Sequence, residues 1–260
     1  MKGMLIDITK CVGCNACREA CREANHLSDE PAAEPANEPL RAGRYTVVQK
    51  RGELFVRRMC MHCAEPTCAS VCPVGAFRKT ALGPVTYDES RCIGCRYCMV
   101  ACPFGVPRYE WTARWPKVSK CTMCADRVAA GGQPACAEAC PTGATLFGDR
   151  DALIAEARRR IAEEPETYFN RVYGLEEVGG TSVLYLSPAP FEQLDMRTDL
   201  VREPLPLLTY RVLSKIPHFV GLWGVVLGGV WWITNRREEV ANAEAPERAT
   251  GGGRRKGGRS

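Results

Sequence analysis

The strongest constraint on this 260-residue chain comes from its sixteen cysteines, which fall into four groups of four. The groups are "CVGCNACREAC" from Cys11, "CMHCAEPTCASVCP" from Cys60, "CIGCRYCMVACP" from Cys92 and "CTMCADRVAAGGQPACAEACP" from Cys121. No cysteine lies outside them, so whatever binds four thiols is bound four times. Residues 1 to 145 carry a modest aliphatic content, and such a stretch needs metal or disulfide cross-links to stay folded.

The spacing within the groups favours iron–sulfur clusters. The groups from Cys11 and Cys92 read C-x2-C-x2-C-x3-C, in which three thiols bind one cubane and the fourth reaches a second cluster. The other two groups widen the middle gap to four and eleven residues but keep the last spacing. Proline follows the last cysteine in three groups and turns the chain away, whereas Arg22 follows Cys21. Gly13 and Gly94 would let the backbone approach the inorganic sulfides.

Zinc and disulfides explain this pattern less well. A zinc site takes two separated cysteine pairs, and three thiols within seven residues overcrowd a single ion. Disulfide frameworks are typical of short secreted chains, and C-x2-C neighbours are poorly placed to bridge each other. A zinc-binding scaffold protein and a catalytic iron–sulfur enzyme are the alternative hypotheses, although the chain lacks the C-x3-C-x2-C radical motif.

The sequence contains no convincing acid–base or nucleophile constellation, so we predict no catalytic residue. The three histidines, His26, His62 and His218, are scattered. His62 lies inside a cysteine loop, which indicates a hydrogen bond to cluster sulfur. Five basic residues near the motifs would either stabilise reduced clusters or serve as ordinary surface charges: Arg57, Arg58, Arg96, Lys117 and Lys120.

Because each group sends its fourth thiol elsewhere, the groups must exchange cysteines in pairs. A nested exchange pairs the first group with the fourth and the second with the third. The spacing alone also permits exchange between adjacent groups.

The four motifs in this order, with "KCTMCADRVAAGGQPACAEACPTGA" as the fourth, resemble the four-cluster ferredoxin subunits of membrane respiratory oxidoreductases. This family includes the electron-transfer subunits of formate dehydrogenase, dimethyl sulfoxide reductase and polysulfide reductase, and the ferredoxin-like subunit of hydrogenase-2. The resemblance covers residues 3 to 148. Downstream, "VYGLEEVGGTSVLYLSPAPFEQLDM" is similar to the segment before the membrane anchor in the formate dehydrogenase and hydrogenase-2 subunits.

The resemblance implies the nested exchange and four 4Fe-4S clusters, because no cysteine is replaced by the Trp or Asp of relatives with a three-iron cluster. We call the implied ligand sets the first set (Cys11, Cys14, Cys17 and Cys140), the second set (Cys60, Cys63, Cys68 and Cys102), the third set (Cys92, Cys95, Cys98 and Cys72) and the fourth set (Cys121, Cys124, Cys136 and Cys21).

The resemblance also implies a function and partners. The chain would be no enzyme itself but would relay electrons between a catalytic subunit and a membrane cytochrome b or quinone-reactive subunit. The catalytic subunit would be a molybdopterin or tungstopterin formate dehydrogenase or a NiFe hydrogenase. An alternative is a molybdopterin reductase that takes electrons from quinol to a terminal acceptor.

We expect an α+β fold of tandem ferredoxin-like dicluster units with small β-hairpins and short helices, followed by a single transmembrane helix. We expect a strand at 4–8 and another from residue 85, each leading into a cysteine loop. An acidic surface loop is expected at 28–40 and a hairpin around Arg51 and Gly52. An amphipathic helix is expected at 151–164, capped by Asp149 or Asp151. The expected domains are 1–148 (clusters), 149–209 (packing segment), 210–236 (anchor) and 237–260 (disordered basic tail).

Residues 216–235 contain no fixed charge and are long enough to cross a bilayer. Trp231 and Trp232 at one end resemble interfacial anchors, and a stripe of glycines would let a partner helix approach. A buried core helix is the alternative, but little chain remains to surround one.

Seven Arg and Lys residues after the span predict a cytoplasmic C-terminus and a cluster domain on the periplasmic face of the inner membrane. The opening "MKGMLIDITK" shows no signal peptide. The resemblance implies export of the folded chain bound to a signal-bearing catalytic subunit; a domain that stays cytoplasmic is the alternative. The basic tail has no aromatic residues for stacking, which argues against a nucleic-acid partner.

Overall fold

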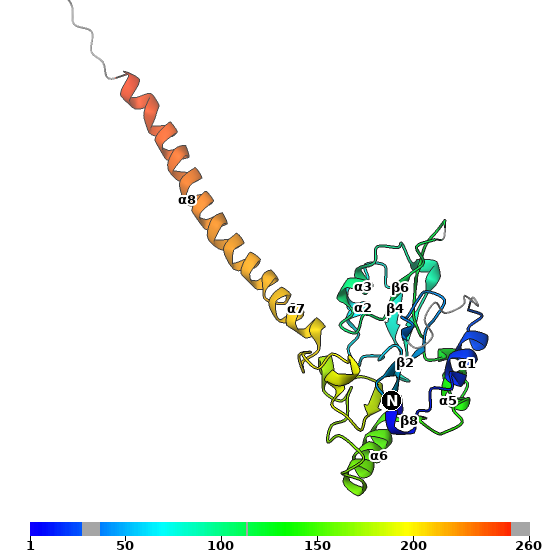
Figure 1. The fold of residues 1–260 in the computed structure, drawn as a ribbon. Coiled ribbons are helices and arrows are strands. Elements are labelled where there is room, and N and C mark those ends of the chain that lie inside the picture. The colour runs from blue at the N-terminus through cyan, green and yellow to red at the C-terminus, as the bar shows by residue number, and fades with distance from the viewer. Residues whose placement is uncertain (28–36, 113, 251–260) are drawn as a thin grey trace, which may run out of the picture. The chain divides into compact units, whose positions relative to one another are not determined.

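The computed structural model describes residues 1–27, 37–112 and 114–250, with side chains up to residue 244. The chain divides into two compact units, Met1–Leu208 and Thr209–Ser260 (Figure 1). Most of the acidic loop expected at 28–40 lies outside the described residues. Small sheets, short helices and a C-terminal apolar helix confirm the expected α+β class.

A three-stranded sheet forms the centre of the first unit. β1 (Lys2–Asp7) is its middle strand, antiparallel to β8 (Thr145–Asp149) and parallel to β9 (Val183–Leu186). Five of its six residues are buried, because Met4 and Ile6 pack into one apolar cluster and Leu5 packs into another. The strand expected at 4–8 is therefore present, and it begins two residues earlier.

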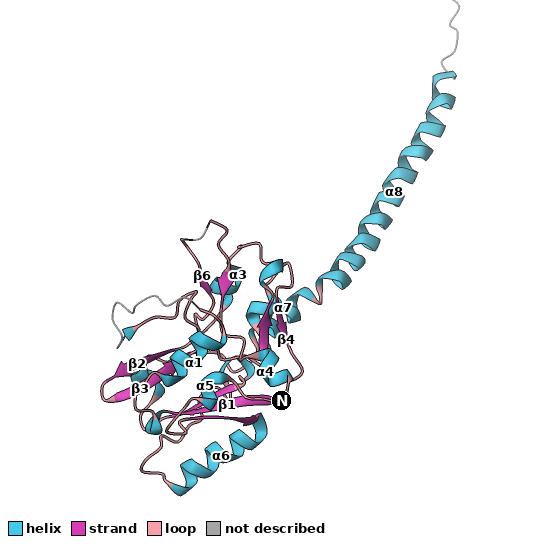
Figure 2. Cartoon of the chain, turned by 90° about the vertical axis from the view of Figure 1, so that its right-hand side faces the viewer, coloured by secondary structure: helices cyan, strands magenta, loops and turns pink. Residues whose placement is uncertain are grey.

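Helix α6 (Arg150–Glu163) covers one face of this sheet, as Figure 2 shows. Leu153 and Ala157 of α6 pack with Leu5 of β1 and Leu184 of β9 in one apolar cluster. This is the expected amphipathic helix, shifted by one residue. Asp149 holds its N-cap position without a side-chain hydrogen bond to the helix.

Three antiparallel hairpins complete the strands of the first unit. They are β2 (Val47–Arg51) with β3 (Leu54–Arg58), β4 (Phe77–Lys79) with β5 (Val85–Tyr87), and β6 (Arg108–Tyr109) with β7 (Val118–Ser119). The first is the expected hairpin, in which Gly52 has the positive φ of 58° that the tight turn needs.

The remaining elements of the first unit are short helices. The α-helices are α1 (Ala16–Ala24), α2 (Thr67–Ser70), α3 (Tyr97–Ala101), α4 (Ala125–Ala129) and α5 (Ala135–Glu138), and the 3₁₀ turns are η1 (Ile8–Lys10), η3 (Glu89–Arg91), η4 (Glu177–Gly179) and η5 (Phe191–Leu194).

Two halves of the cysteine-rich region repeat one local design. At the end of β1 the Asp7 carboxylate accepts a hydrogen bond from the Thr9 N–H at 3.1 Å, and after β5 Asp88 accepts one from the Ser90 N–H at 3.0 Å. Each aspartate turns the chain into a 3₁₀ turn, a cysteine loop and a short helix. The strand pairing repeats as well: β1 is antiparallel to β8, and β5 is likewise antiparallel to β4. The expected internal duplication is therefore present.

The second unit is helical as far as residue 250, where its description ends, and the first of its helices begins in the first unit. α7 (Leu205–Leu213) and α8 (Ile216–Thr250) contain a 40-residue stretch, Leu205–Glu244, long and apolar enough to cross a membrane. None of its most apolar window is buried. The expected span at 216–235 lies within α8. The helix continues through residues 237–250, where we expected disorder, because "EEVANAEA" consists mostly of good helix formers.

Candidate metal centres

Left-handed backbone positions shape the four cysteine loops. Gly13 has φ +70° and Gly94 has φ +71° at the same place in the first and third groups. His62 and Met123 have φ of 49° and 58° just before the second cysteine of their own groups. Residues other than glycine rarely adopt this backbone conformation. Its recurrence at the same place in the four groups indicates that the cysteine loops share one tight backbone turn.

A small cavity brings the first set together. Its lining includes Cys11, Cys14, Cys17 and Cys140, although Cys140 comes from the far end of the cysteine-rich region. Burial raises the pKa of the Cys11 thiol, the Gly13 N–H lowers it, and the sulfurs of Cys140 and Cys14 raise it again.

The second and third sets also gather their sulfurs. Burial raises the pKa of Cys63 well above its ordinary value, and the sulfurs of Cys60, Cys102 and Cys68 raise it further. Burial raises the pKa of Cys98 to about 12, with the sulfurs of Cys92, Cys95 and Cys72 contributing. In both cases the sulfurs that raise the pKa are the other members of the same predicted set.

The fourth set joins the first helix to the last cysteine group. The pKa of Cys21 is raised to about 12, mainly by burial. The sulfurs of Cys136 and Cys124 contribute to the rise, and the Arg57 cation opposes it. Burial also raises the pKa of Cys121 well above its usual value, and the sulfurs of Cys21, Cys60 and Cys136 raise it further. The assignment of all sixteen cysteines to four clusters stays a prediction.

Neighbouring sulfurs also connect one set to the next. Burial raises the pKa of Cys17, Arg57 opposes this, and Cys136 of the fourth set has the largest effect among the neighbouring sulfurs. Cys121 of the fourth set is influenced by Cys60 of the second, and these four cysteines belong to one apolar cluster. Burial raises the pKa of Cys68 to about 12, and its sulfur neighbours include Cys98 of the third set, with which it shares a second cluster. With the ligand sets as predicted, these neighbours favour the order first, fourth, second, third.

The donor chemistry of these sites fits 4Fe-4S clusters. Backbone N–H groups donate to sulfur from Ala76 to Cys72 (3.3 Å), from Val106 to Cys102 (3.5 Å) and from Met123 to Cys121 (3.3 Å). Such bonds stabilise thiolate ligands. Buried thiols that raise one another's pKa become stable thiolates when bound iron neutralises their charge.

A single zinc ion fits this arrangement poorly. Among the described residues, no three His, Cys, Asp or Glu side chains converge closely enough to hold one metal ion. Zinc–sulfur bonds of about 2.3 Å would draw the four sulfurs of a set tightly together. A four-iron cubane is larger, and its ligand sulfurs stand further apart.

His62 is a buried donor without a partner in the described protein. Its side chain is fully buried, and its Nδ1 accepts a hydrogen bond from the Val85 N–H at 2.9 Å. The hydrogen of the neutral ring therefore lies on Nε2, which has no partner among the described residues. Burial lowers the pKa of His62 well below 6.5, and Lys120 and Lys79 lower it further. The predicted hydrogen bond to cluster sulfur stays a prediction.

The five basic residues near the motifs differ sharply in environment. Arg57 and Lys120 are each only 2% exposed. In contrast, Arg96 lies over the ring of Trp111, at 5.2 Å from its centroid, and Lys117 pairs with Glu89 at 2.9 Å. Sequence reasoning could not separate these residues, because all five stand close to a cysteine.

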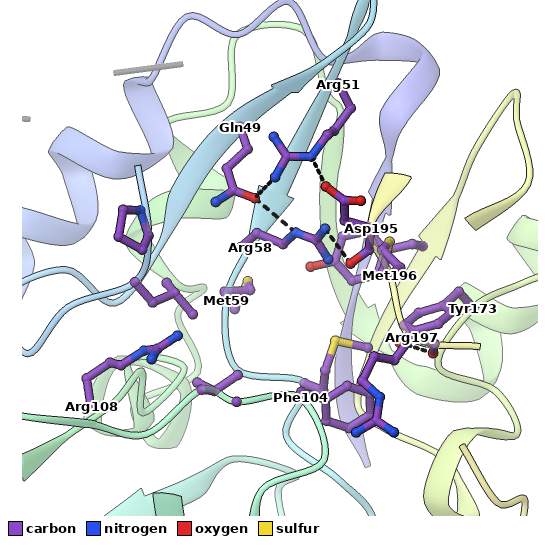
Figure 3. Close-up of a pocket in the computed structure, with 16 residues that line it drawn as sticks. Gln49, Arg51, Arg58, Met59, Phe104, Arg108, Tyr173, Asp195, Met196 and Arg197 are labelled. Carbon is purple, nitrogen blue, oxygen red and sulfur yellow. Dashed lines mark hydrogen bonds and ion pairs between the residues drawn. The ribbon is translucent and has the colours of Figure 1, made fainter. Parts of the chain in front are cut away.

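A cavity of about 290 Å³, which no sequence motif predicted, lies beside the second set (Figure 3). Met59 and Met61, which flank Cys60, form part of its lining. Arg51 pairs with Asp195 at 2.6 Å across its rim, and Arg58 donates to the Asp195 carbonyl at 2.9 Å. These arginines therefore already have protein partners.

Known proteins share these motifs along most of the chain. Residues 10–76 and 52–150 each match a 4Fe-4S dicluster domain. A protein of Nitratidesulfovibrio vulgaris is 41% identical over 258 residues, covering 94% of this chain and 70% of the relative. Hydrogenase-2 operon protein HybA of Escherichia coli O157:H7 is 37% identical, covering 75% and 72%.

The iron–sulfur subunit of the nitrate-inducible formate dehydrogenase of Escherichia coli K12 is 38% identical, covering 84% of this chain and 75% of the relative. Its similarity, like that of HybA, extends beyond the matched cysteine regions into the rest of the chain. The chain therefore belongs to the 4Fe-4S dicluster family that includes HybA and the iron–sulfur subunits of formate dehydrogenases.

Proposed function

We propose that this chain is the electron-transfer subunit of a membrane oxidoreductase and holds four 4Fe-4S clusters on the four ligand sets. The observation that carries the proposal is the packing of cysteines from different sets together: Cys17, Cys60, Cys121 and Cys136 share one apolar cluster, and Cys68 and Cys98 share another. It supports a row of clusters in the order first, fourth, second, third. When bound, such clusters supply one-electron carriers with potentials from roughly −700 to +450 mV.

The protein supplies the spacing and the insulation of this row. At the link between the fourth and second sets, Cys121 and Cys60 are both buried and belong to the same apolar cluster. At the two ends, side chains next to the cysteines are exposed, including Val12 in the first group and Ile93 in the third. This arrangement favours entry and exit of electrons at the first and third sets.

We expect two kinds of partner subunit. The names of the relatives refer to hydrogenase-2 and formate dehydrogenase, which supports a NiFe or molybdopterin catalytic subunit. The stretch Leu205–Glu244 would insert into the lipid bilayer, where Gly221, Gly224 and Gly228 leave room for a helix of a cytochrome b or quinone-binding subunit.

Metal analysis of the anaerobically purified chain tests the cofactor. We expect about sixteen irons and sixteen acid-labile sulfides per chain, because each cubane contains four of each. About four zinc ions per chain, with no sulfide, would instead support the zinc-binding scaffold.

A matched pair of variants tests the ligand sets. Cys98 and Cys17 hold equivalent places in the third and first groups. We expect Cys98→Ser to disturb the second and third clusters and leave the other two assembled, and Cys17→Ser to do the reverse. Loss of all four clusters in both variants, with the chain still folded, would contradict the nested sets.

The orientation in the membrane needs its own test. We propose a cytoplasmic C-terminus, because Arg and Lys outnumber Asp and Glu in the segment after the apolar span. A green fluorescent protein fused to residue 260 should fluoresce, since it matures in the cytoplasm. Protease added to intact spheroplasts should then digest the cysteine-rich unit and spare the fusion; the reverse pattern would place that unit inside the cell.

A further inference from the structure

Arg57 is a buried cation at the junction of the first and fourth sets. It lies near the end of β3 and is 2% exposed. Its Nε donates to the Thr46 hydroxyl at 2.9 Å, and its Nη1 donates to the Thr145 hydroxyl at 3.1 Å. Among the described residues its Nη2 makes no close hydrogen bond and no carboxylate pairs with the guanidinium, whose interacting neighbour is the Cys136 sulfur.

An unpaired buried charge is costly, so the absence of a carboxylate calls for another counter-charge. Two hydroxyls satisfy part of the guanidinium but carry no charge. Arg57 lines the cavity of the first set, together with Cys11, Cys14 and Cys17. Burial alone would lower the pKa of Arg57, but the sulfurs of Cys136 and Cys17 raise it above its ordinary value. The nearest source of negative charge is therefore the sulfur of both sets.

We propose that Arg57 is a fixed cation shared by the first and fourth clusters and that it raises the reduction potential of both. The proposal rests on the ligand sets of the proposed function. Reduction adds one negative charge to a cluster that is already anionic with four thiolates. A cation held beside it stabilises the reduced form more than the oxidised form, and in a buried site the effect is weakly screened. The unpaired Nη2 group adds an N–H donor for cluster sulfur.

The internal duplication supplies a matched position without this charge. Val118 stands three residues before Cys121, as Arg57 stands three residues before Cys60. Val118 is 2% exposed and packs with Cys98 and Phe77, next to the second and third sets. Phe77 in turn holds the place in β4 that Thr145 holds in β8, since each begins the strand that follows its cysteine group.

At these matched positions an arginine and a threonine stand near the outer pair of clusters (the first and fourth), where a valine and a phenylalanine stand near the inner pair (the second and third). The inner pair has a different buried cation, Lys120: burial raises the pKa of Cys68, and Lys120 opposes this. Lys120 donates to the carbonyl oxygens of Val85 and Cys121 at 2.5 and 2.8 Å and lies over the Phe77 ring. The two cations thus hold different positions of the repeat, and Val118 is the control for the position of Arg57 alone.

The experiment places the same side chain at both positions. Arg57→Met and Val118→Met are made in the full chain within its membrane complex, and the midpoint potentials are measured by titration monitored with electron paramagnetic resonance. Spectra of Cys17→Ser and Cys98→Ser assign signals to the outer and inner pairs. We expect Arg57→Met to lower the reduction equilibrium constants of the first and fourth clusters at least tenfold, about 59 mV each. Val118→Met should leave all four unchanged.

Two further variants keep the test decisive. Arg57→Lys retains the charge and should keep the potentials close to those of the natural protein. Arg57→Gln removes the charge but keeps hydrogen-bonding groups, and it should show the same lowering if Arg57→Met loses its clusters. Arg58→Met removes a neighbouring arginine that donates to the Leu194 and Asp195 carbonyls and should have no effect on the outer pair.

Unchanged outer potentials in Arg57→Gln or Arg57→Met with four intact clusters would overturn the proposal. Equal shifts in all four clusters would overturn it as well, because they would show a general structural effect. A shift confined to the inner pair would instead overturn the ligand sets of the proposed function.

Discussion

Gly13 and Gly94 occupy the same place in two cysteine loops, yet alanine at each should have unequal effects. Both residues have φ near +70°, where an L side chain costs about 1–2 kcal/mol. At Gly13 an added Cβ would lie 2.4 Å from the Cδ1 atom of the Phe55 ring. Such overpacking typically costs about 1–3 kcal/mol more. At Gly94 the nearest atom is the Tyr109 hydroxyl, at 3.2 Å, which needs a shift of only a few tenths of an ångström.

We therefore expect Gly13→Ala to lower the free energy of unfolding by about 2–5 kcal/mol and Gly94→Ala by about 1–2 kcal/mol. Thermal unfolding of the anaerobic protein, followed by cluster absorbance and circular dichroism, measures both. For a unit of this size each kcal/mol shifts the midpoint by roughly 2–4 °C, so Gly13→Ala should lose roughly 4–20 °C.

The double variant Gly13→Ala with Phe55→Leu serves as the control, because the smaller side chain removes the ring that the new Cβ would meet. It should recover the part of the loss that comes from overpacking. Equal midpoints for the two single alanine variants would refute this reasoning. They would indicate that both glycines are needed for close approach of the backbone to the clusters, independent of the neighbouring aromatic ring.

Three other predictions concern the stability and attachment of the chain. Arg160→Met should lower the free energy of unfolding by about 3–5 kcal/mol in thermal unfolding, because the buried Asp7 carboxylate loses the cation that lies 2.7 Å from it. Arg159→Met, on the exposed face of α6, should change the stability little. Equal effects of the two variants would contradict a contribution from the buried pair. Removal of iron by a chelator under reducing conditions should abolish near-ultraviolet dichroism of the first unit, and a retained native spectrum would show that the clusters are not needed for its fold. A chain ending at Leu208 should leave membranes in a salt wash when partner subunits are absent, and persistent attachment would contradict an anchor in the second unit.

The local elements of the fold were predictable from sequence, and the tertiary contacts were not. Cysteine spacing indicated the loops, and the residues around Gly52 indicated the hairpin of β2 and β3. The run "VLYL" of β9 gave no pairing signal, because a short apolar segment does not reveal which strand it will join. The two arginines that end β3 looked alike, but strand alternation sends Arg57 into the interior while Arg58 reaches Asp195. The candidate site was thus predictable in its cysteines and unpredictable in the charge between them.

The position of β1 in its sheet affects how the molecule is made. β1 is synthesised before both of its neighbours, because its antiparallel neighbour β8 begins at Thr145 and its parallel neighbour β9 ends at Leu186. Its hydrogen-bonding edges therefore stay open until residues 145–186 have been made, whereas β4 and β5 are close in sequence and form a local hairpin. We consequently expect the cysteine loop that follows β1 to close only after β9 has been synthesised, and delivery of iron and sulfide to that loop to be completed no earlier.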